Sequence, residues 1–388
     1  MEFPKPINLK VDIVTDERDF FALESVWNPL LARSGVNTIF LTFEWLSTWW
    51  KHFGHRHRLF VVVVRKGKEI VALFPLMITR REGFQQLGYI SNKIIDYKDF
   101  IIDAEQDREQ VIRGILNTLV GAGGWDFLML NGFPEDSVNF QAFKDALSGF
   151  PNNKTAFGDA NVSPYIPIKG TWEDYWKSLK KSFRVNTSGQ LNKLLKKSDT
   201  YSYEFCVNEN EIDGLIDKII SLNAKKWVED KNQGSVFDDP VMRSFYKDLS
   251  KRVFHLGWLK ISAIMINKEI ASVYLDFQYA QKYFHVIPSY DQKFSTYSPG
   301  RLLLVYLIQK AFENELIEFD LLGGNESYKY NFNPIERKIF TIGFFQRGTK
   351  AYFAYRWFFG IRPHLERLEE SPLRNIYWWY RKLSLRKG

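Results

Sequence analysis

The segment Ser298-Pro299-Gly300-Arg301 has the residue types of an anion-binding helix start. Serine favours the N-cap position of a helix, and proline favours the first helical position. Gly300 leaves the backbone open to close approach, and the first N–H groups of a helix attract phosphate or carboxylate. Arg301 adds a cation able to contact such an anion. We therefore expect Ser298, Gly300 and Arg301 to bind a cofactor or co-substrate, although an ordinary capped helix has the same features.

Residues with acid–base chemistry flank this segment on both sides. His285 lies upstream in an apolar run, Asp320 lies in the next apolar stretch, and Tyr328 follows a glycine pair. A histidine suits a general base near neutral pH, and a tyrosine suits a proton donor. We predict His285, Asp320 and Tyr328 as catalytic, with His285 acting directly or Asp320 through water as the base. The alternatives are a structural histidine and an ion pair of Asp320 with Lys329 or Arg301.

A repeated pattern of elements would position these residues. Two β-branched hairpins are each followed by a helical stretch and then by an apolar strand. The expected ranges are 59–78, 106–120 and 125–130 in the first copy, and 258–277, 301–314 and 317–322 in the second. Such a repeat favours two related α/β domains over one large fold.

Proline and glycine between Pro164 and Gly170 mark the division of the chain. The predicted domains are residues 1–168 and 169–350, followed by a basic aromatic helical tail over 351–388. A long lysine-rich helix is expected over Glu173–Lys197, capped by Thr171. Gly189 is the expected position of a kink or break in this helix.

Composition excludes several classes of protein. The chain has 388 residues, 45% hydrophobic content and a net charge of +8, which suits two globular domains. Its one cysteine, Cys206, excludes a disulfide framework, and we find no metal-ligand spacing and no glycine-rich nucleotide motif. The N-terminus lacks a secretion pattern, and no apolar run approaches the ~18 residues of a membrane span. We predict a cytoplasmic protein without a metal.

Aromatic and basic residues alternate in the tail. Packing of this tail against the domains is the first expectation, and contact with an anionic membrane surface at the inner face of the cell membrane is the second. RNA, including tRNA, is the third, because aromatic rings stack on bases. DNA is not expected as a partner.

Ordered motifs along the chain resemble one family. In the first half they are Phe40-x-x-x-Glu44-Trp45-Leu46, Leu73-x-Pro75-Leu76, Asp96-Tyr97-x-Asp99 and Ser182-x-Arg184-x-Asn186. In the second half they are Trp227, Tyr290-Asp291, Tyr297-Ser298-Pro299-Gly300, Asp320-x-x-x-Gly324 and Tyr328-Lys329. Over almost the whole chain this order resembles the CelD-type, FemAB-like N-acyltransferases of the GNAT fold.

The resemblance implies an architecture and a set of substrate contacts. It implies an α/β protein of two tandem GNAT-like domains, joined by a long basic helix, with a mixed and mainly antiparallel sheet flanked by helices in each domain. Substrate-binding roles are implied for Asp96, Tyr97, Arg184, Trp227, Tyr290 and Lys329.

The resemblance also implies an activity. An acyl group, acetyl above all, would move from acyl-coenzyme A or acetyl-CoA to the amine of a small molecule or glycan in polysaccharide or cell-envelope synthesis. Fem-like relatives use aminoacyl-tRNA, so a tRNA-dependent peptidyltransferase is one alternative. A non-catalytic binding module in envelope-polymer assembly is the other. Ordinary GNAT enzymes carry a glycine-repeat donor loop, and Ser298-Pro299-Gly300 stands in its place here.

Overall fold

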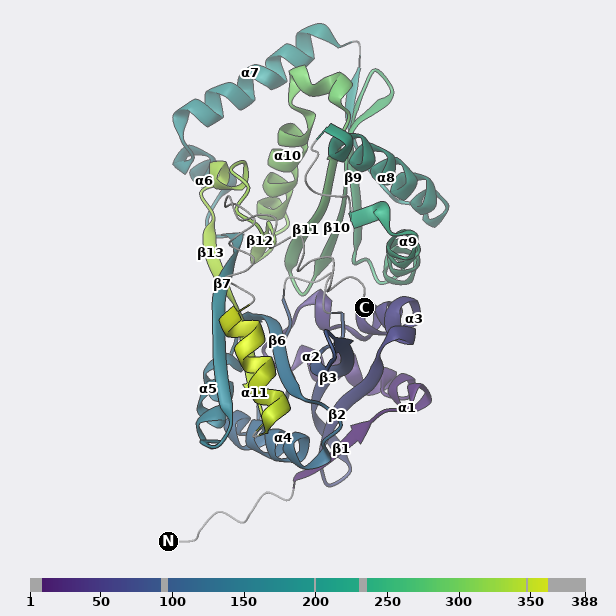
Figure 1. Ribbon diagram of the computed structural model, residues 1–388. Coiled ribbons are helices and arrows are strands. Elements are labelled where there is room, and N and C mark those ends of the chain that lie inside the picture. Colours follow the sequence, from purple (N-terminus) through teal and green to yellow (C-terminus); the bar gives the residue numbers. More distant parts are fainter. Residues whose placement is uncertain (1–8, 92–96, 199, 230–235, 347, 362–388) are drawn as a thin grey trace. The chain divides into compact units, whose positions relative to one another are not determined.

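The computed structural model describes residues 9–91, 97–198, 200–229, 236–346 and 348–361 (Figure 1). These residues form two compact units. The first unit contains the chain up to Asn161 and again from Lys338 onward, and the second contains Val162–Arg337. The two predicted GNAT-like halves are thus present as separate units, and each is described by itself.

The first unit is built on a mixed sheet in the order β1-β2-β3-β4-β6-β13. Neighbouring strands are antiparallel except β4 and β6, which are parallel. The strands are β1 (Leu9–Val14), β2 (Arg58–Lys66), β3 (Glu69–Arg81), β4 (Phe84–Tyr89), β6 (Phe127–Pro134) and β13 (Ile335–Phe345), with the short β5 (Ile101–Ile102) paired to β3. The helices are α1 (Glu17–Phe21), α2 (Glu24–Ala32), α3 (Phe43–Phe53), α4 (Arg108–Ala122), α5 (Phe140–Ser148) and α11 (Thr349–Tyr355).

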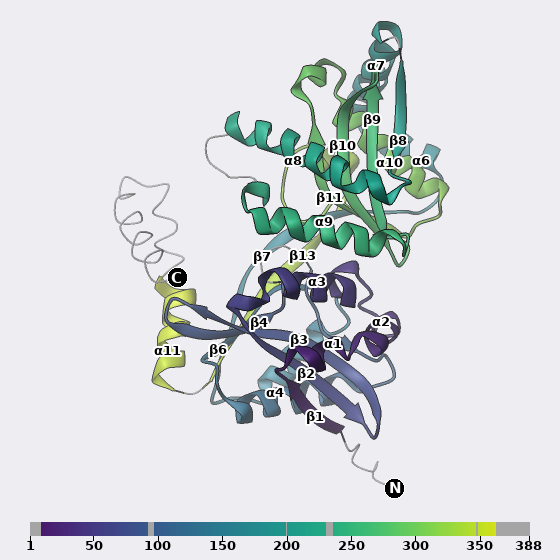
Figure 2. The ribbon, with the colours of Figure 1, turned by 90° about the vertical axis from the view of Figure 1, so that its right-hand side faces the viewer.

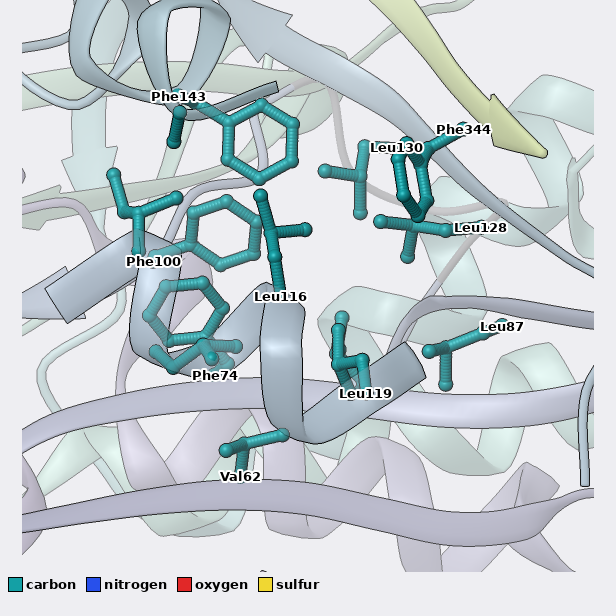
Figure 3. Packing of buried hydrophobic residues seen from close by; sticks show 14 of the residues in the cluster. Val62, Phe74, Leu87, Phe100, Leu116, Leu119, Leu128, Leu130, Phe143 and Phe344 are labelled. Carbon is teal, nitrogen blue, oxygen red and sulfur yellow. The ribbon is translucent and has the colours of Figure 1, made fainter. Parts of the chain in front are cut away.

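Aromatic and branched side chains fill the core of the first unit (Figure 3). Phe74 of β3 stacks on Phe100 with ring centroids 3.7 Å apart, and Leu116 of α4 is fully enclosed beside the sheet. Burial of such large apolar side chains stabilises a fold by about 1.5–3 kcal/mol each. Side chains of β2 and β3, the strands of the first predicted hairpin, therefore form part of this core.

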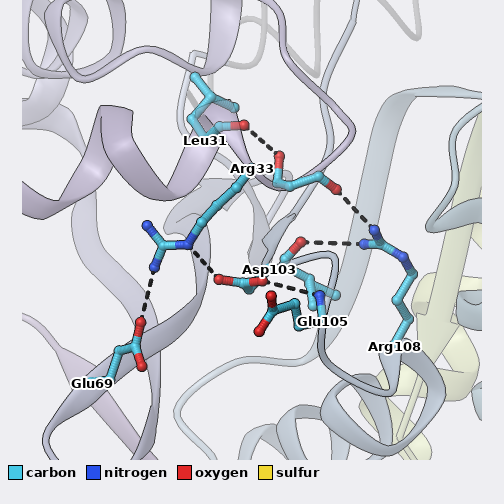
Figure 4. Close-up of polar contacts among 8 residues, drawn as sticks. Leu31, Arg33, Glu69, Asp103, Glu105 and Arg108 are labelled. Carbon is cyan, nitrogen blue, oxygen red and sulfur yellow. Dashed lines mark hydrogen bonds and ion pairs between the residues drawn. The ribbon is translucent and has the colours of Figure 1, made fainter.

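Arginine side chains connect α2 and α4 to the strands of the first unit (Figure 4). Arg33 donates to Asp103 at 2.5 Å and to Glu69 at 3.2 Å. Arg108, the first residue of α4, donates to the carbonyl oxygens of Ser34 and Ile102. The Arg108 guanidinium at the start of α4 thus makes its hydrogen bonds within the first unit.

The second unit repeats the same order of strands. Its sheet runs β7-β12-β11-β10-β9-β8, and β11 and β12 are the parallel pair. The strands are β7 (Lys154–Pro167), β8 (Tyr201–Phe205), β9 (Leu259–Ile266), β10 (Glu269–Tyr279), β11 (Lys282–Tyr290) and β12 (Glu318–Asp320). Helices α8 (Ile212–Glu229) and α9 (Pro240–Phe254) cover one face, and α6 (Trp172–Ser178), α7 (Lys181–Lys197) and α10 (Pro299–Glu313) cover the other (Figures 1 and 2).

The predicted hairpin repeat is confirmed. The hairpins are β2–β3 and β9–β10. Helix α4 precedes β6, which is parallel to β4, and α10 precedes β12, which is parallel to β11. The final strand of each sheet comes from the other half of the sequence. Residues 339–345 of β13 pair with β6, and residues 165–167 of β7 pair with β12. The segment 338–350, predicted to end the second domain, consequently lies in the first unit.

The prediction of one helix over 173–197 is wrong. Two helices, α6 and α7, are separated at Leu179, whose backbone is extended and whose side chain is buried in the core of the second unit. Gly189, the expected break, lies inside α7 with open space around it. The predicted cap is confirmed, because the Thr171 hydroxyl accepts from the backbone N–H of Asp174.

The described part of the aromatic tail packs on the first unit, as expected. Ala351 and Ala354 of α11 and Phe358 of the following π-helix (Arg356–Ile361) are buried against Phe127 and Phe345. Residues 362–388 of the tail lie outside the described residues. Within the described part of the chain, no helix combines the length and apolarity needed to cross a membrane.

Asp99 is a buried carboxylate in the first unit. It accepts hydrogen bonds from the Phe100 N–H at 2.7 Å, from Asn139 Nδ2 at 2.8 Å and from the Ser137 hydroxyl. Burial outweighs these donors and raises the pKa of Asp99 from 3.8 to about 6. The ionised form is therefore disfavoured by folding.

We expect Asp99 to make the protein less stable as pH rises. The stabilising contribution of the protonated form is fully present below pH 3.8 and is lost as pH rises through about 6. The loss is on the order of 3 kcal/mol in the free energy of unfolding. Urea unfolding between pH 4 and 7 should show this loss in the wild type and not in Asp99→Asn. Asp145→Asn, at an exposed position, is the control, and equal pH dependence in all three proteins would contradict the expectation.

Candidate active site

A pocket of about 410 Å³ opens in the second unit beside the N-terminus of α10. Five residues predicted from the sequence line it: Tyr290, Ser298, Gly300, Arg301 and Tyr328. The rest of the wall is mainly apolar and consists of Phe183, Tyr274, Pro288, Ser295, Pro299, Leu304, Asn331 and Phe332. The structure thus brings the predicted anion site and a predicted proton donor into one cavity.

Divergence of two parallel strands makes room for this pocket. β11 and β12 pair over Lys282–Phe284 and Glu318–Asp320. β12 then ends, whereas β11 continues to Tyr290. Beyond Phe284 this side of β11 has no parallel partner. The start of α10 and the 3-10 turn Lys329–Phe332 border the pocket there.

The first N–H groups of α10 are open. Ser298 occupies the predicted N-cap position, but it adopts a left-handed conformation with φ 52° and its side chain makes no capping hydrogen bond. Pro299 has no N–H to offer, and the Leu302 N–H bonds to the Ser298 carbonyl. Among the described residues, no acceptor faces the N–H groups of Gly300 and Arg301. These two donors, together with the positive end of the helix dipole, suit an anion.

The backbone at Gly300 is in close contact with Tyr274. The Tyr274 hydroxyl donates to the Gly300 carbonyl oxygen at 2.5 Å. A Cβ at this position would lie 3.1 Å from the same hydroxyl oxygen, so a side chain would displace one of the two. Arg301 is held at the rim, where it donates to Asn186 Oδ1 at 2.8 Å and lies over the Phe183 ring.

His285 lies behind the pocket wall and does not line the cavity. Its side chain is 1% exposed, and Nδ1 lies 3.1 Å from the fully buried Asp276 carboxylate. The imidazole packs edge-on against Tyr274 with ring centroids 4.7 Å apart. Asp276 was missed in the sequence, where the available signal was a carboxylate within the otherwise apolar run of β10.

Asp320 is also fully buried and holds the end of β12. It accepts from Arg337 Nη1 at 3.1 Å and from the Leu322 N–H at 2.8 Å. Arg337 binds Glu318 of the same strand at 2.9 Å as well. The ion pair expected for Asp320 is therefore made by Arg337, which the sequence did not single out. Buried carboxylates require such a partner because desolvation of an unpaired charge is costly.

Lys329 and Arg301, the expected partners of Asp320, have other contacts. Lys329 is buried, and its Nζ donates to the carbonyl oxygens of Leu322 at 3.0 Å and Gly323 at 2.7 Å. It also pairs with Glu326 at 3.0 Å. Lys329 thus closes the loop after β12 and does not line the pocket.

Tyr328 lines the pocket wall and is 38% exposed. Burial, followed by the nearby carboxylates Glu326 and Asp276, raises its pKa well above the ordinary tyrosine value. Burial likewise raises the pKa of Tyr274. Both hydroxyls are consequently protonated at neutral pH and act as hydrogen-bond donors.

Of the other predicted substrate contacts, Tyr97 and Arg184, like Lys329, are not among the described residues that line this pocket. Tyr97 is buried in the first unit, and Asp96 lies outside the described residues. Arg184 donates to the Leu179 carbonyl at the break between α6 and α7. Trp227 belongs to α8, and its side chain lies outside the described part. Their roles stay predictions.

Comparisons with known proteins give a family match over part of the chain and a fold similarity over most of it. Residues 181–330 match the family model of the acetyltransferase (GNAT) domain. The fold is similar to a crystal structure of FemX, with a TM-score of 0.61, 9% identity, and coverage of 90% of this chain and 99% of that chain. It is also similar to a conserved protein of unknown function from Bacteroides thetaiotaomicron VPI-5482, with a TM-score of 0.54, 10% identity, and coverage of 87% and 100%. No curated protein sequence matches the chain.

Loss of the Arg337 cation should strongly destabilise the second unit. Arg337→Met leaves the carboxylates of Glu318 and Asp320 buried without their cation, and breaking a buried pair costs about 3–5 kcal/mol. Lys293→Met is the control, since it breaks an ion pair with Glu269 at exposed positions, where the cost is about 0–1 kcal/mol. Chemical denaturation of both variants measures the difference. Equal losses in the free energy of unfolding would show that the buried cluster stabilises the protein no more than an exposed ion pair does.

Proposed function

We propose that this chain, a FemAB-like acyltransferase of the GNAT fold, takes the acyl group from acyl-coenzyme A and transfers it to an amine. The observation that carries the proposal is one pocket that combines two open helix N–H groups, the Arg301 cation and the protonated Tyr328 hydroxyl. An acyl donor with an anionic carrier needs both an anion site and a donor for its leaving group.

The pocket suits a phosphate group followed by an apolar arm. The N–H groups of Gly300 and Arg301 fit one phosphate, and the missing Cβ of Gly300 permits close approach. Phe183, Leu304 and Phe332 then provide an apolar wall for the carrier arm and the acyl group. A single glycine at the closest approach takes the place of the glycine repeat of ordinary GNAT enzymes.

We propose a reaction in which Tyr328 acts from the pocket wall, whereas His285, enclosed behind Tyr274, acts through water. The amine nitrogen attacks the thioester carbonyl, and its excess proton passes through a water molecule to Nε2 of His285. The C–S bond breaks, and the departing thiolate takes the proton of the Tyr328 hydroxyl. Tyr328 regains a proton from solvent, and His285 releases one to it. General acid–base catalysis of this kind contributes about 10²–10⁴-fold each.

The acceptor that we propose is an amine on a saccharide or another envelope precursor. This part of the proposal rests on the resemblance to CelD-type proteins described above. The aminoacyl-tRNA alternative is favoured by one observation. Helix α7, which carries Lys181, Arg184 and Lys193, contributes Phe183 to the pocket and Asn186 to the Arg301 contact. A basic helix beside an acyl site suits a nucleic-acid backbone.

Acetyl-coenzyme A should bind to the wild-type protein in isothermal titration calorimetry. Gly300→Ala should weaken binding at least tenfold, about 1.4 kcal/mol, because the added Cβ displaces Tyr274 or the start of α10. Gly189→Ala, with open space around the glycine, should bind normally. If acetyl-coenzyme A does not bind and an aminoacylated RNA minihelix does, the alternative replaces the proposal. Binding of neither would contradict both.

Tyr328→Phe should lower kcat by about 10²-fold with little change in KM for acetyl-coenzyme A, because the lost hydroxyl acts on the leaving group. The assay measures thiol release with glucosamine and other amines as acceptors. Tyr330→Phe is the matched control, since the Tyr330 hydroxyl bonds to Glu336 and does not line the pocket. Equal kcat values in the two variants would remove Tyr328 from the mechanism.

A further inference from the structure

The strand pairing beside the pocket is irregular at Asp276. Leu275 of β10 pairs with Ile287 of β11, and Phe277 pairs with Phe284. Asp276 therefore faces two residues of β11, His285 and Val286, which form a β-bulge. A bulge interrupts the backbone ladder and redirects the side chains at that point, and bulges are common next to active sites.

The Asp276 carboxylate holds this bulge together. Its Oδ1 accepts from the Val286 N–H at 2.9 Å and lies 3.1 Å from His285 Nδ1. Its Oδ2 accepts from the Tyr283 hydroxyl at 3.0 Å. The side chain is fully buried. A buried carboxylate is maintained by donors of this number and quality.

The same contact determines which nitrogen of His285 carries the proton. An ionised carboxylate accepts hydrogen bonds and donates none, so Nδ1 is the N–H donor. Nε2 then carries a lone pair, and in the described part of the chain this buried atom has no hydrogen-bond partner. Most buried side-chain nitrogens in proteins have a hydrogen-bond partner. His285 instead retains an available acceptor next to Tyr274, a residue of the pocket wall.

We propose that Asp276 is the positioning residue of the acyl-transfer base. It fixes the His285 ring in the bulge, holds the proton on Nδ1 and stabilises the imidazolium that forms when Nε2 receives the proton of the attacking amine. Asp320 cannot exchange roles with Asp276, because Arg337 and the Leu322 N–H occupy its oxygens. The inference rests on the proposed function in that it assigns His285 as the base of that reaction.

The tautomer of His285 can be measured without substrate. Long-range ¹H–¹⁵N spectra of the protein labelled at histidine nitrogen distinguish a protonated Nδ1 from a protonated Nε2. His285 is one of six histidines, and His285→Gln assigns its signals by their loss. At about pH 7 we expect the Nδ1–H form in the wild type. In Asp276→Leu the acceptor that faces Nδ1 is lost, so the proton should move to Nε2.

Tyr283→Phe is the matched control, because it removes one hydrogen bond to the same carboxylate and leaves the contact with His285. It should keep the Nδ1–H tautomer. A wild-type His285 found as Nε2–H or as imidazolium would overturn the proposal even if Asp276→Leu failed to fold. An unchanged tautomer in a folded Asp276→Leu protein would overturn it as well.

Kinetics provide the second measurement. Asp276→Asn should lower kcat at least 100-fold in acetyl transfer to glucosamine, with KM for acetyl-coenzyme A changed less than threefold. Tyr283→Phe should keep kcat within threefold. If Asp276→Asn raised only KM and left kcat unchanged, Asp276 would maintain the shape of the binding pocket. That result would overturn its role in positioning the base. Failure of acetyl-coenzyme A to bind the wild type would reject the proposed function and leave the tautomer result standing.

Discussion

The buried ion cluster of Arg337 with Glu318 and Asp320 is the interaction on which the site depends. Two carboxylates on a three-residue strand could not be enclosed without a cation, and Arg337 contacts both. The cluster ties the start of β13 to β12. β12 pairs only with the beginning of β11, so the rest of β11 has no parallel partner on that side. The pocket exists because this strand pairing is short and firmly held.

Three side chains in or next to the pocket have partners that fix their direction. Tyr274 is held against Gly300, Arg301 against Asn186, and His285 against Asp276. Within the described part of the chain, the two N–H groups at the start of α10 and Nε2 of His285 have no hydrogen-bond partner. Preorganised groups of this kind can act on a substrate without the energetic cost of rearrangement.

The two units share a topology but differ at the equivalent helix start. In α4 the side chain of Asp107 caps its own helix by accepting from the Gln110 N–H, and Arg108 donates to backbone carbonyls of its own unit. In α10 the Ser298 side chain makes no such bond. A carboxylate on the helix end repels an incoming anion, whereas open N–H groups attract one. This difference is the reason why we propose an anion site in the second unit and not in the first.

The sequence by itself determined the features that depend on nearby residues. The two hairpins, the helices before β6 and β12, the Thr171 cap and the helix start at Pro299 follow from side-chain periodicity and from local backbone preferences. One pocket is lined by five residues that were singled out in the sequence, Ser298, Gly300, Arg301, Tyr290 and Tyr328, and their roles stay predictions. Tertiary structure alone decided the rest. The break at Leu179, the exchanged strands β7 and β13, the pairing of Asp320 with Arg337 and the role of Asp276 all depend on contacts between distant segments. A local sequence pattern does not indicate which distant residue neutralises a buried charge or which distant strand completes a sheet. The interaction energies of such contacts arise only when the folded chain brings the groups together.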